Sequence, residues 1–237
     1  MFSRKRTRAI AVGVIAIAVG GAAYGIVSAT SSSSSAAPGT ANTTTVGSNP
    51  RSGSGAGGAS NARSGPASGG TVGTVGSVSK SSFTVSTSAG QKVTVDEASS
   101  TKYQKGTSST AASAIRTGEP VLVLGTTSGT TITATQVIVQ PTGGSGTSSA
   151  VVPFQRGAPS TSKQVGQIPA NYTQGSGTIV SGTTANKATE AALAAYPGGV
   201  VDRVVKLSNG EYEVHNIGVN WPHHVFVNKN FKVVGAN

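Results

Sequence analysis

Two long stretches of this 237-residue chain contain almost no large apolar side chain, which limits where a hydrophobic core can form. Residues 30–69 and 142–176 consist mainly of Ser, Gly, Thr and Ala. Such segments bury too little apolar surface to offset the conformational entropy that folding costs. We therefore predict a multidomain chain, in which folded domains at 70–141 and 177–237 are separated by disordered, low-complexity spacers at 30–69 and 142–176.

The second spacer is less uniform in composition than the first, because it holds a few apolar side chains. They belong to Val151, Val152, Phe154 and Ile168. We expect these residues to dock the segment onto a folded domain.

The N-terminal 29 residues have the charge pattern of a bacterial export segment. Four cations precede an uncharged stretch from Ala9 to Ala29, and the next charge is Arg51. Cations on one side only place the N-terminus in the cytoplasm and the rest of the chain outside. The uncharged stretch has 21 residues, enough to cross a bilayer as a transmembrane helix.

Two fates of this export segment stay open. The stretch holds seven alanines and four glycines, and Val27-Ser28-Ala29 is a small-residue motif of the kind at which signal peptides are cleaved. We favour a single-pass anchor at residues 9–29 in the cell membrane, with extracellular C-terminal domains. The alternative is secretion after signal cleavage near Ala29. In both cases the protein belongs to the cell envelope.

The net charge of +11 does not indicate nucleic-acid binding once its distribution is considered. Four cations lie in the export segment and four in the spacers. Residues 70–141 hold five cations against three anions, and residues 178–237 hold five against four. Because nucleic-acid-binding proteins concentrate positive charge on a folded face, we expect no nucleic-acid partner.

Residues 71–141 show the alternation that is typical of β-strands with one buried face. Apolar and hydroxyl residues alternate over 82–86 and over 92–96. Near the end of the region the apolar parity changes between Ala134 and Val137, which predicts a β-bulge or a strand that bends around a barrel corner. Six short strands with glycine corners predict a small all-β barrel or sandwich.

These strands also carry a resemblance to a known family. The residues concerned are Gly73–Val78, Ser82–Val85, Gly90–Asp96, Gly118–Gly125 and Thr131–Val137. With them the region resembles a family of small bacterial extracytoplasmic β-domains of unknown function. The resemblance covers most of 70–141 and implies an extracytoplasmic β-domain, but no chemistry.

The C-terminal region predicts an α+β module, with one helix on an antiparallel meander. Ala185, Ala188 and Ala192 lie on one stripe of a helix that ends before Pro197. Four strands follow at 200–207, 211–217, 224–228 and 231–234, with hairpin turns around Asn209-Gly210 and Lys229-Asn230. On the second strand we expect Glu211, Glu213 and His215 to face solvent.

The same region resembles the PepSY-type domain. The matching segments are the helix that ends in Tyr196-Pro197-Gly198-Gly199, then Val200–Val204, Gly210–His215 and Val225–Gly235. The resemblance implies an exported bacterial protein with a polypeptide partner, and a role in restraining a peptidase has been proposed for the family. This chain departs from the family at Trp221-Pro222-His223-His224, which stands in a turn that is otherwise filled by small polar residues.

The three histidines are candidates for a metal site, and they do not form a convincing one. Neighbouring residues of a strand point to opposite faces, so His223 and His224 are not expected to bind one ion together with His215. The chain has no cysteine to complete a ligand set. We expect no metal and no small-molecule cofactor.

No catalytic motif stands in a predicted folded segment, so we expect no enzyme. The chain lacks a nucleophile elbow, a phosphate-binding loop and a dinucleotide fingerprint outside its spacers. The favoured function is a non-enzymatic envelope module that binds a polypeptide through Trp221, Tyr212 and Phe231. A solvent-exposed Trp221 would be an interface anchor, whereas the alternative is that it folds back over the sheet edge. The competing function is a structural spacer with no specific ligand.

Overall fold

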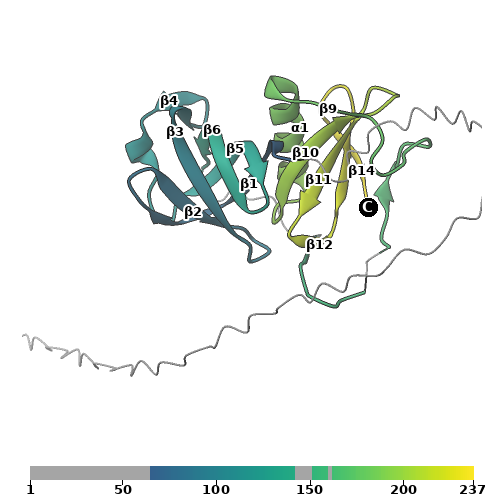
Figure 1. Cartoon of the computed structure of the whole chain (residues 1–237), viewed down its shortest axis with the longest axis horizontal. Helices are drawn as coiled ribbons and strands as arrows, with labels where there is room; N and C mark the ends of the chain where they lie inside the picture. The colour runs from purple at the N-terminus through teal and green to yellow at the C-terminus, as the bar shows by residue number, and fades with distance from the viewer. Residues whose placement is uncertain (1–64, 142–150, 160–161) are drawn as a thin grey trace, which may run out of the picture. The chain divides into compact units, whose positions relative to one another are not determined.

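A computed structural model describes residues 65–141, 151–159 and 162–237 (Figure 1). The described residues all belong to one compact unit. They are mostly β-structure, with one α-helix and a barrel of five strands. The predicted export segment and most of the first predicted spacer lie outside the described residues. No helix in the described ranges is long and apolar enough to cross a membrane.

The barrel is built from the region that the sequence analysis assigned to β-structure. Its strands are β1 (Ala67–Val78), β2 (Ser82–Ser86), β3 (Lys92–Lys105), β5 (Pro120–Ser128) and β6 (Thr131–Val139). They follow the order β2-β3-β6-β5-β1, and β1 pairs with β2 to close the barrel. Only β3 and β6 are parallel within this ring. This topology is that of an OB-fold barrel.

The structure confirms the barrel and corrects the number of its strands. Five strands close the ring, and the short β4 (Ser108–Thr110) pairs only with the end of β3 before a 3₁₀ turn at Ala112–Ala114. The predicted bulge is confirmed, because the β5–β6 register shifts where Gly125 faces Ala134 and Leu124 faces Gln136. Alternating apolar side chains such as Phe83 fill the interior, and each buried one stabilises the barrel by about 1.5–3 kcal/mol.

The C-terminal region places helix α1 (Gly182–Ala195) against one face of an antiparallel sheet (Figure 1). The sheet order is β10, β11, β13, β14, with bounds Val200–Lys206, Tyr212–Ile217, His224–Val227 and Val233–Ala236. The predicted stripe Ala185, Ala188 and Ala192 is buried, and it contacts Val204 and Val214. Small alanine side chains let the helix lie close to the sheet.

Two details of this region differ from the prediction. An additional strand, β12 (Val219–Trp221), leaves the meander and pairs with β7 (Val152–Pro153). The last strand begins at Val233 rather than at Phe231, because Phe231 adopts a positive φ of 55° in the preceding turn.

Strand β1 belongs to both the barrel and the C-terminal sheet. Gly70 and Thr71 pair with β5 on one side and with β10 on the other. The Thr71 hydroxyl also donates to the Gly199 carbonyl at 2.9 Å, and the Thr87 hydroxyl donates to the Gly198 carbonyl at 2.6 Å. The strand starts at Ala67, so structure extends into the residues for which a spacer was predicted.

The described part of the second predicted spacer also has fixed contacts. We call residues 162–177 the strap. Its strand β8 (Val165–Gly166) pairs with β14, and β9 (Thr178–Ile179), directly after the strap, pairs with β10. Ile168 and Tyr172 pack with Phe226 on the sheet face opposite α1. A segment with few apolar residues can thus be ordered by docking, as was predicted for Ile168.

The junction at β1 depends on glycine, which gives a first testable prediction. A Cβ atom on Gly69 would lie 1.9 Å from the Val201 carbonyl oxygen, so Gly69→Ala must push β10 away from β1. Overpacking of this kind costs about 1–3 kcal/mol of the free energy of unfolding. Urea denaturation followed by circular dichroism measures the change.

Gly65→Ala is the matched control for that experiment, since a Cβ there meets no atom within 4 Å. Its free energy of unfolding should stay within about 0.5 kcal/mol of the parent protein. Equal stability of the two variants would contradict the role assigned to the junction.

Candidate functional site

Ionisable side chains gather on the sheet face that lies opposite α1. Strands β10, β11 and β13 contribute Asp202, Arg203, Glu213, His215 and His224. The register places Arg203 opposite His215, and His215 opposite His224. A bulge between Val201 and Arg203 inserts Asp202 as an extra residue, and this brings its carboxylate to the same cluster.

Asp202 and His215 form the first carboxylate–histidine pair. Their Oδ1 and Nδ1 atoms lie 2.6 Å apart, so the imidazole donates a proton from Nδ1 to the carboxylate. Arg203 Nη1 lies 3.3 Å from Asp202 Oδ2 and balances this charge. Arg203 is 3% exposed, and its Nε has no hydrogen-bond partner. A buried guanidinium depends strongly on its single carboxylate partner.

Glu213 and His224 form the second pair, and the strap completes it. Glu213 Oε1 lies 2.6 Å from His224 Nδ1, and the Tyr172 hydroxyl donates to the same oxygen at 3.2 Å. Burial raises the pKa of Tyr172, and the negative charge of Glu213 raises it further. Tyr172 therefore keeps its proton and acts as a donor. Its ring also meets Phe226 edge to face, with centroids 4.8 Å apart.

The prediction that Glu213 faces solvent is wrong. Its side chain is 1% exposed, because Tyr172 and the rest of the strap cover this face of the sheet. His215 is also largely covered, at 14% side-chain exposure. Strand alternation gave the correct face for both residues. It could not show that a distant, serine-rich segment folds over that face.

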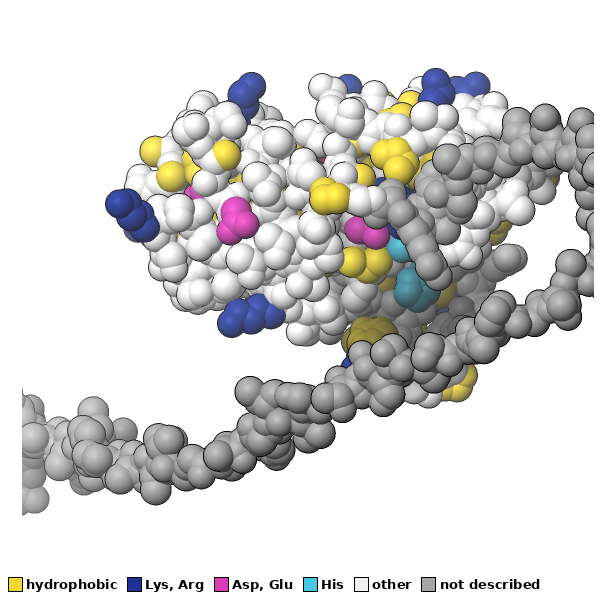
Figure 2. All heavy atoms as spheres, viewed as in Figure 1, with side chains coloured by type: hydrophobic (Ala, Val, Ile, Leu, Met, Phe, Trp, Pro, Cys, Tyr) yellow, Lys and Arg dark blue, Asp and Glu magenta, His cyan; other side chains and the backbone are white. Residues whose placement is uncertain are grey.

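A cavity of about 560 Å³ opens beside this cluster. The residues that line it are of polar types apart from one isoleucine, namely Ser162, Lys163, Gln164, Gln174, His215, Ile217, His223, His224 and Asn237. Figure 2 shows histidine side chains reaching the surface next to an acidic side chain. Two strap amides, Asn237 and the three histidines thus surround one space that offers both donors and acceptors.

The cavity brings all three histidines together, which strand alternation did not predict. His223 precedes the first residue of β13, so the alternation rule does not apply to it. Its Nδ1 lies 3.2 Å from the Asn216 carbonyl oxygen, while His215 and His224 bind carboxylates through Nδ1. Burial lowers the pKa of His223, and the nearby His215 and His224 lower it further, against the Asn216 hydrogen bond.

The geometry does not supply a ready metal centre. Within the described ranges, no three side chains of the ligating types are placed to hold one ion together. The Nδ1 atoms of His215 and His224 are occupied by Asp202 and Glu213. The arrangement can instead present fixed imidazoles to a bound molecule.

Trp221 is not the exposed anchor that was one of its two predicted roles. It is 1% exposed, and its Nε1 donates to the Lys163 carbonyl of the strap at 2.7 Å. Tyr196 meets its ring edge to face at 5.4 Å, and Lys163 Nζ lies 4.5 Å from the ring centroid. The alternative, in which Trp221 folds back onto the structure, is the one observed. It fixes one end of the strap.

Tyr212 and Phe231 lie away from the histidines, on the side of the sheet that carries α1. Their rings are stacked, with centroids 5.5 Å apart and planes at 10°. Both are partly exposed and pack against the helix-side core, where Lys187 Nζ lies 5.5 Å from the Phe231 ring. The three predicted partner-binding residues therefore do not form one surface.

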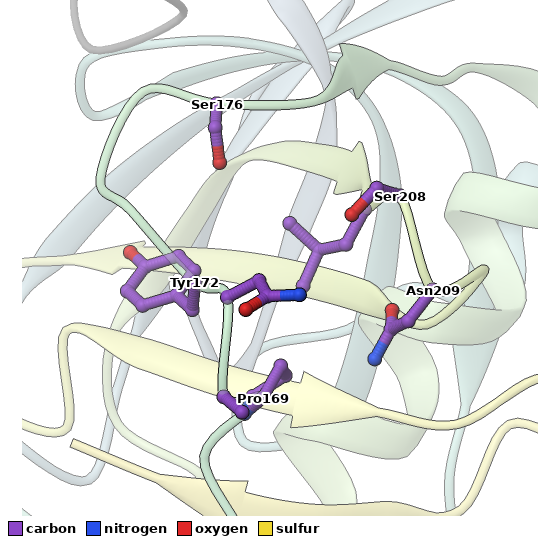
Figure 3. A pocket seen from close by; sticks show the side chains of 8 residues that line it. Pro169, Tyr172, Ser176, Ser208 and Asn209 are labelled. Atoms are coloured by element: carbon purple, nitrogen blue, oxygen red, sulfur yellow. The ribbon is translucent and has the colours of Figure 1, made fainter.

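A smaller cavity of about 180 Å³ lies between the middle of the strap and the turn that follows β10 (Figure 3). Pro169 and Tyr172 of the strap line it, together with Ser208 and Asn209 of the β10–β11 turn.

The barrel offers no comparable site on the face that OB-folds use for nucleic acids. The outward residues of β2 and of the first half of β3 are small or charged, namely Ser82, Thr84, Ser86, Lys92, Thr94 and Asp96. No aromatic ring stands among them to stack on a base.

Comparison of the chain with protein-family models, with curated proteins and with solved structures found no match in any of the three. The resemblances to a PepSY-type domain and to an extracytoplasmic β-domain stay predictions.

Burial of Trp221 gives a second testable prediction. Trp221→Ala removes a buried ring and its hydrogen bond to the strap, so the free energy of unfolding should fall by about 3–5 kcal/mol. Trp221→Phe keeps a ring against Tyr196 and should cost less. Urea denaturation followed by circular dichroism separates the two, and a neutral Trp221→Ala would contradict the burial.

The hydroxyl of Tyr172 gives a third testable prediction. Tyr172→Phe removes the hydroxyl that donates to the buried Glu213, so we expect a loss of about 1–3 kcal/mol of unfolding free energy. Tyr103→Phe is the matched control, because its hydroxyl also donates to a glutamate, Glu97, at 2.7 Å, but in a more exposed setting. The control should lose less than about 1 kcal/mol. If Tyr103→Phe loses more unfolding free energy than Tyr172→Phe in urea denaturation, the strap does not shield Glu213 from solvent.

Proposed function

We propose that this chain is an exported, non-enzymatic binding protein of the cell envelope, and that its folded part recognises a polypeptide partner. The observation that carries the proposal is the polar cavity beside β14, with Gln164, Gln174 and Asn237 in its lining. Each of these amides offers one donor group and one acceptor, as a peptide group does. The fixed imidazoles of His215 and His224 add oriented polar contacts.

The chemistry of the cluster supports binding rather than catalysis. A hydrolase needs a nucleophile next to a base, and within the described hydrogen bonds of His215 and His224 the one hydroxyl partner is that of Tyr172. Its raised pKa makes this hydroxyl a poor nucleophile. The two carboxylates already serve as partners of the imidazoles.

The sequence supports the cellular setting of the proposal. Residues 9–29 would anchor the chain in the membrane, and the Ser/Gly-rich stretch before Ala67 would act as a spacer that holds the folded part outside. Signal cleavage near Ala29 would release the same folded part. The PepSY resemblance supports a polypeptide as partner, including a peptidase whose activity is restrained.

A photo-crosslinking experiment tests this function in intact cells and gives the fourth prediction. The full chain carries a photoreactive residue in place of Gln174 in the cavity, or in place of Thr94 on the outer barrel face as a control. We expect a crosslinked polypeptide from position 174 and none from position 94. Identical patterns, or no adduct at position 174, would favour the structural spacer.

Two further crosslinking experiments test which contacts hold the partner at position 174. Asn237→Ala removes one amide from the cavity, and a lost hydrogen bond of about 1.4 kcal/mol should reduce the adduct roughly tenfold. A chelator should leave the adduct unchanged. If the chelator abolishes it, the three histidines act through a metal ion and the peptide-binding site is misassigned.

A further inference from the structure

The outer edge of β14 is occupied by the chain's own strap. Gly235 pairs with Gly166 and Ala236 pairs with Val165 in an antiparallel ladder. The Gln167 amide also donates to the Val234 carbonyl at 2.8 Å. A free sheet edge would expose these backbone groups, and an added strand is a common way in which proteins bind an extended peptide. The strap fills this position as a bound peptide would.

The strap fills the edge incompletely. Its ladder covers two of the four residues of β14, and Gln167 adds a single hydrogen bond to Val234. Val165 is only partly packed against the sheet, because the residue is 40% exposed. A polypeptide in regular extended conformation could instead pair with β14 along its whole length. The strap is thus a weaker occupant than an ideal strand.

The strap is held more firmly on both sides of this ladder. The Lys163 carbonyl accepts the hydrogen bond of Trp221, and Ile168 packs into the core beside Phe226. Only the short stretch 164–167 would have to leave the edge. Displacement of four residues exposes β14 without dismantling the ionisable cluster beneath Tyr172.

The edge and the polar cavity are continuous. Asn237 follows β14 directly, Gln164 precedes β8, and both line the cavity. A strand added along β14 would therefore run past the cavity, and one of its side chains could enter between Gln174, Asn237 and the histidines. Backbone pairing would supply affinity, and the cavity would supply selectivity.

We propose that the edge of β14 accepts an extended strand from a polypeptide partner, and that residues 164–167 are a built-in competitor for this edge. The inference rests on the proposed function and names the surface through which it acts. The competitor is tethered, so its effective concentration at the edge is high and a partner strand must pair better than it does.

A reversible disulfide tests the proposal, because the chain has no cysteine of its own. Val165→Cys combined with Ala236→Cys places two thiols at directly paired positions, a spacing that suits a disulfide. The probe is a labelled synthetic peptide with the sequence of residues 162–174, and anisotropy measures its binding to the full chain. We expect the oxidised protein to bind the peptide at least tenfold more weakly than the reduced protein. Equal affinities overturn the proposal.

Two glycine substitutions provide a second test. One of them should expel the strap from the edge, whereas the disulfide locks it there. A Cβ on Gly166 would lie 2.2 Å from the Val234 carbonyl oxygen, so Gly166→Ala should expel the strap from the edge. Gly157→Ala is the matched control, with a φ of 79° and no atom within 4 Å of the added Cβ. We expect Gly166→Ala to bind the peptide at least tenfold more tightly than Gly157→Ala. If the two bind equally, the strap is not a competitor.

The two proposals fail in different ways. The cysteine pair can be combined with the photoreactive residue at position 174. If the oxidised chain still gives the crosslinked partner, the partner binds the cavity without the edge, so the edge proposal falls and the proposed function stands. If reduced and oxidised chains both give no adduct while the peptide still distinguishes them, the edge exists but the partner proposal falls. Loss of the adduct on oxidation alone supports both.

Discussion

The close approach of three strands around Gly69, Gly70 and Thr71 is the constraint on which the described structure depends. Strand β1 must pair with β5 to complete the barrel and with β10 to begin the second sheet. The backbone of β10 lies so near that an ordinary side chain at Gly69 has no room. Hydroxyl groups of Thr71 and Thr87 then bind the Gly199 and Gly198 carbonyls, which fixes the start of β10 against the barrel.

A second dependence follows from charge burial on the face opposite α1. Arg203 and Glu213 are almost completely covered, and unpaired charges in such a setting destabilise a fold by several kcal/mol. The carboxylate of Asp202 supplies the compensating contact to Arg203, and the imidazole of His224 and the hydroxyl of Tyr172 supply those to Glu213. The strap is therefore more than a cover, because it provides one of the groups that make the burial of Glu213 tolerable.

The sequence predicts well those elements whose periodicity is local. Alternating residues at 82–86 and 92–96 gave barrel strands, the parity change after Ala134 gave the bulge, and the alanine stripe gave the buried face of α1. The candidate site was harder, since its cover comes from a segment distant in sequence. Strap residues have a spacer's composition, and only Ile168 and Tyr172 mark the docking. Trp221 looked equally suited to an exposed or a buried position, because its Lys163 partner is set by tertiary structure alone.

The double pairing of β1 also bears on the order in which the chain can fold during synthesis. The barrel strands are adjacent in sequence, so the barrel can close once β6 has been made. The partner of Thr71 at Gly199 comes 128 positions later in the chain. Until then the first half of β1 is an open strand edge, exposed to pairing with other chains. Its glycines offer a neighbouring chain no side chains to pack on, so the residues that later admit β10 also make this edge a poor template for aggregation.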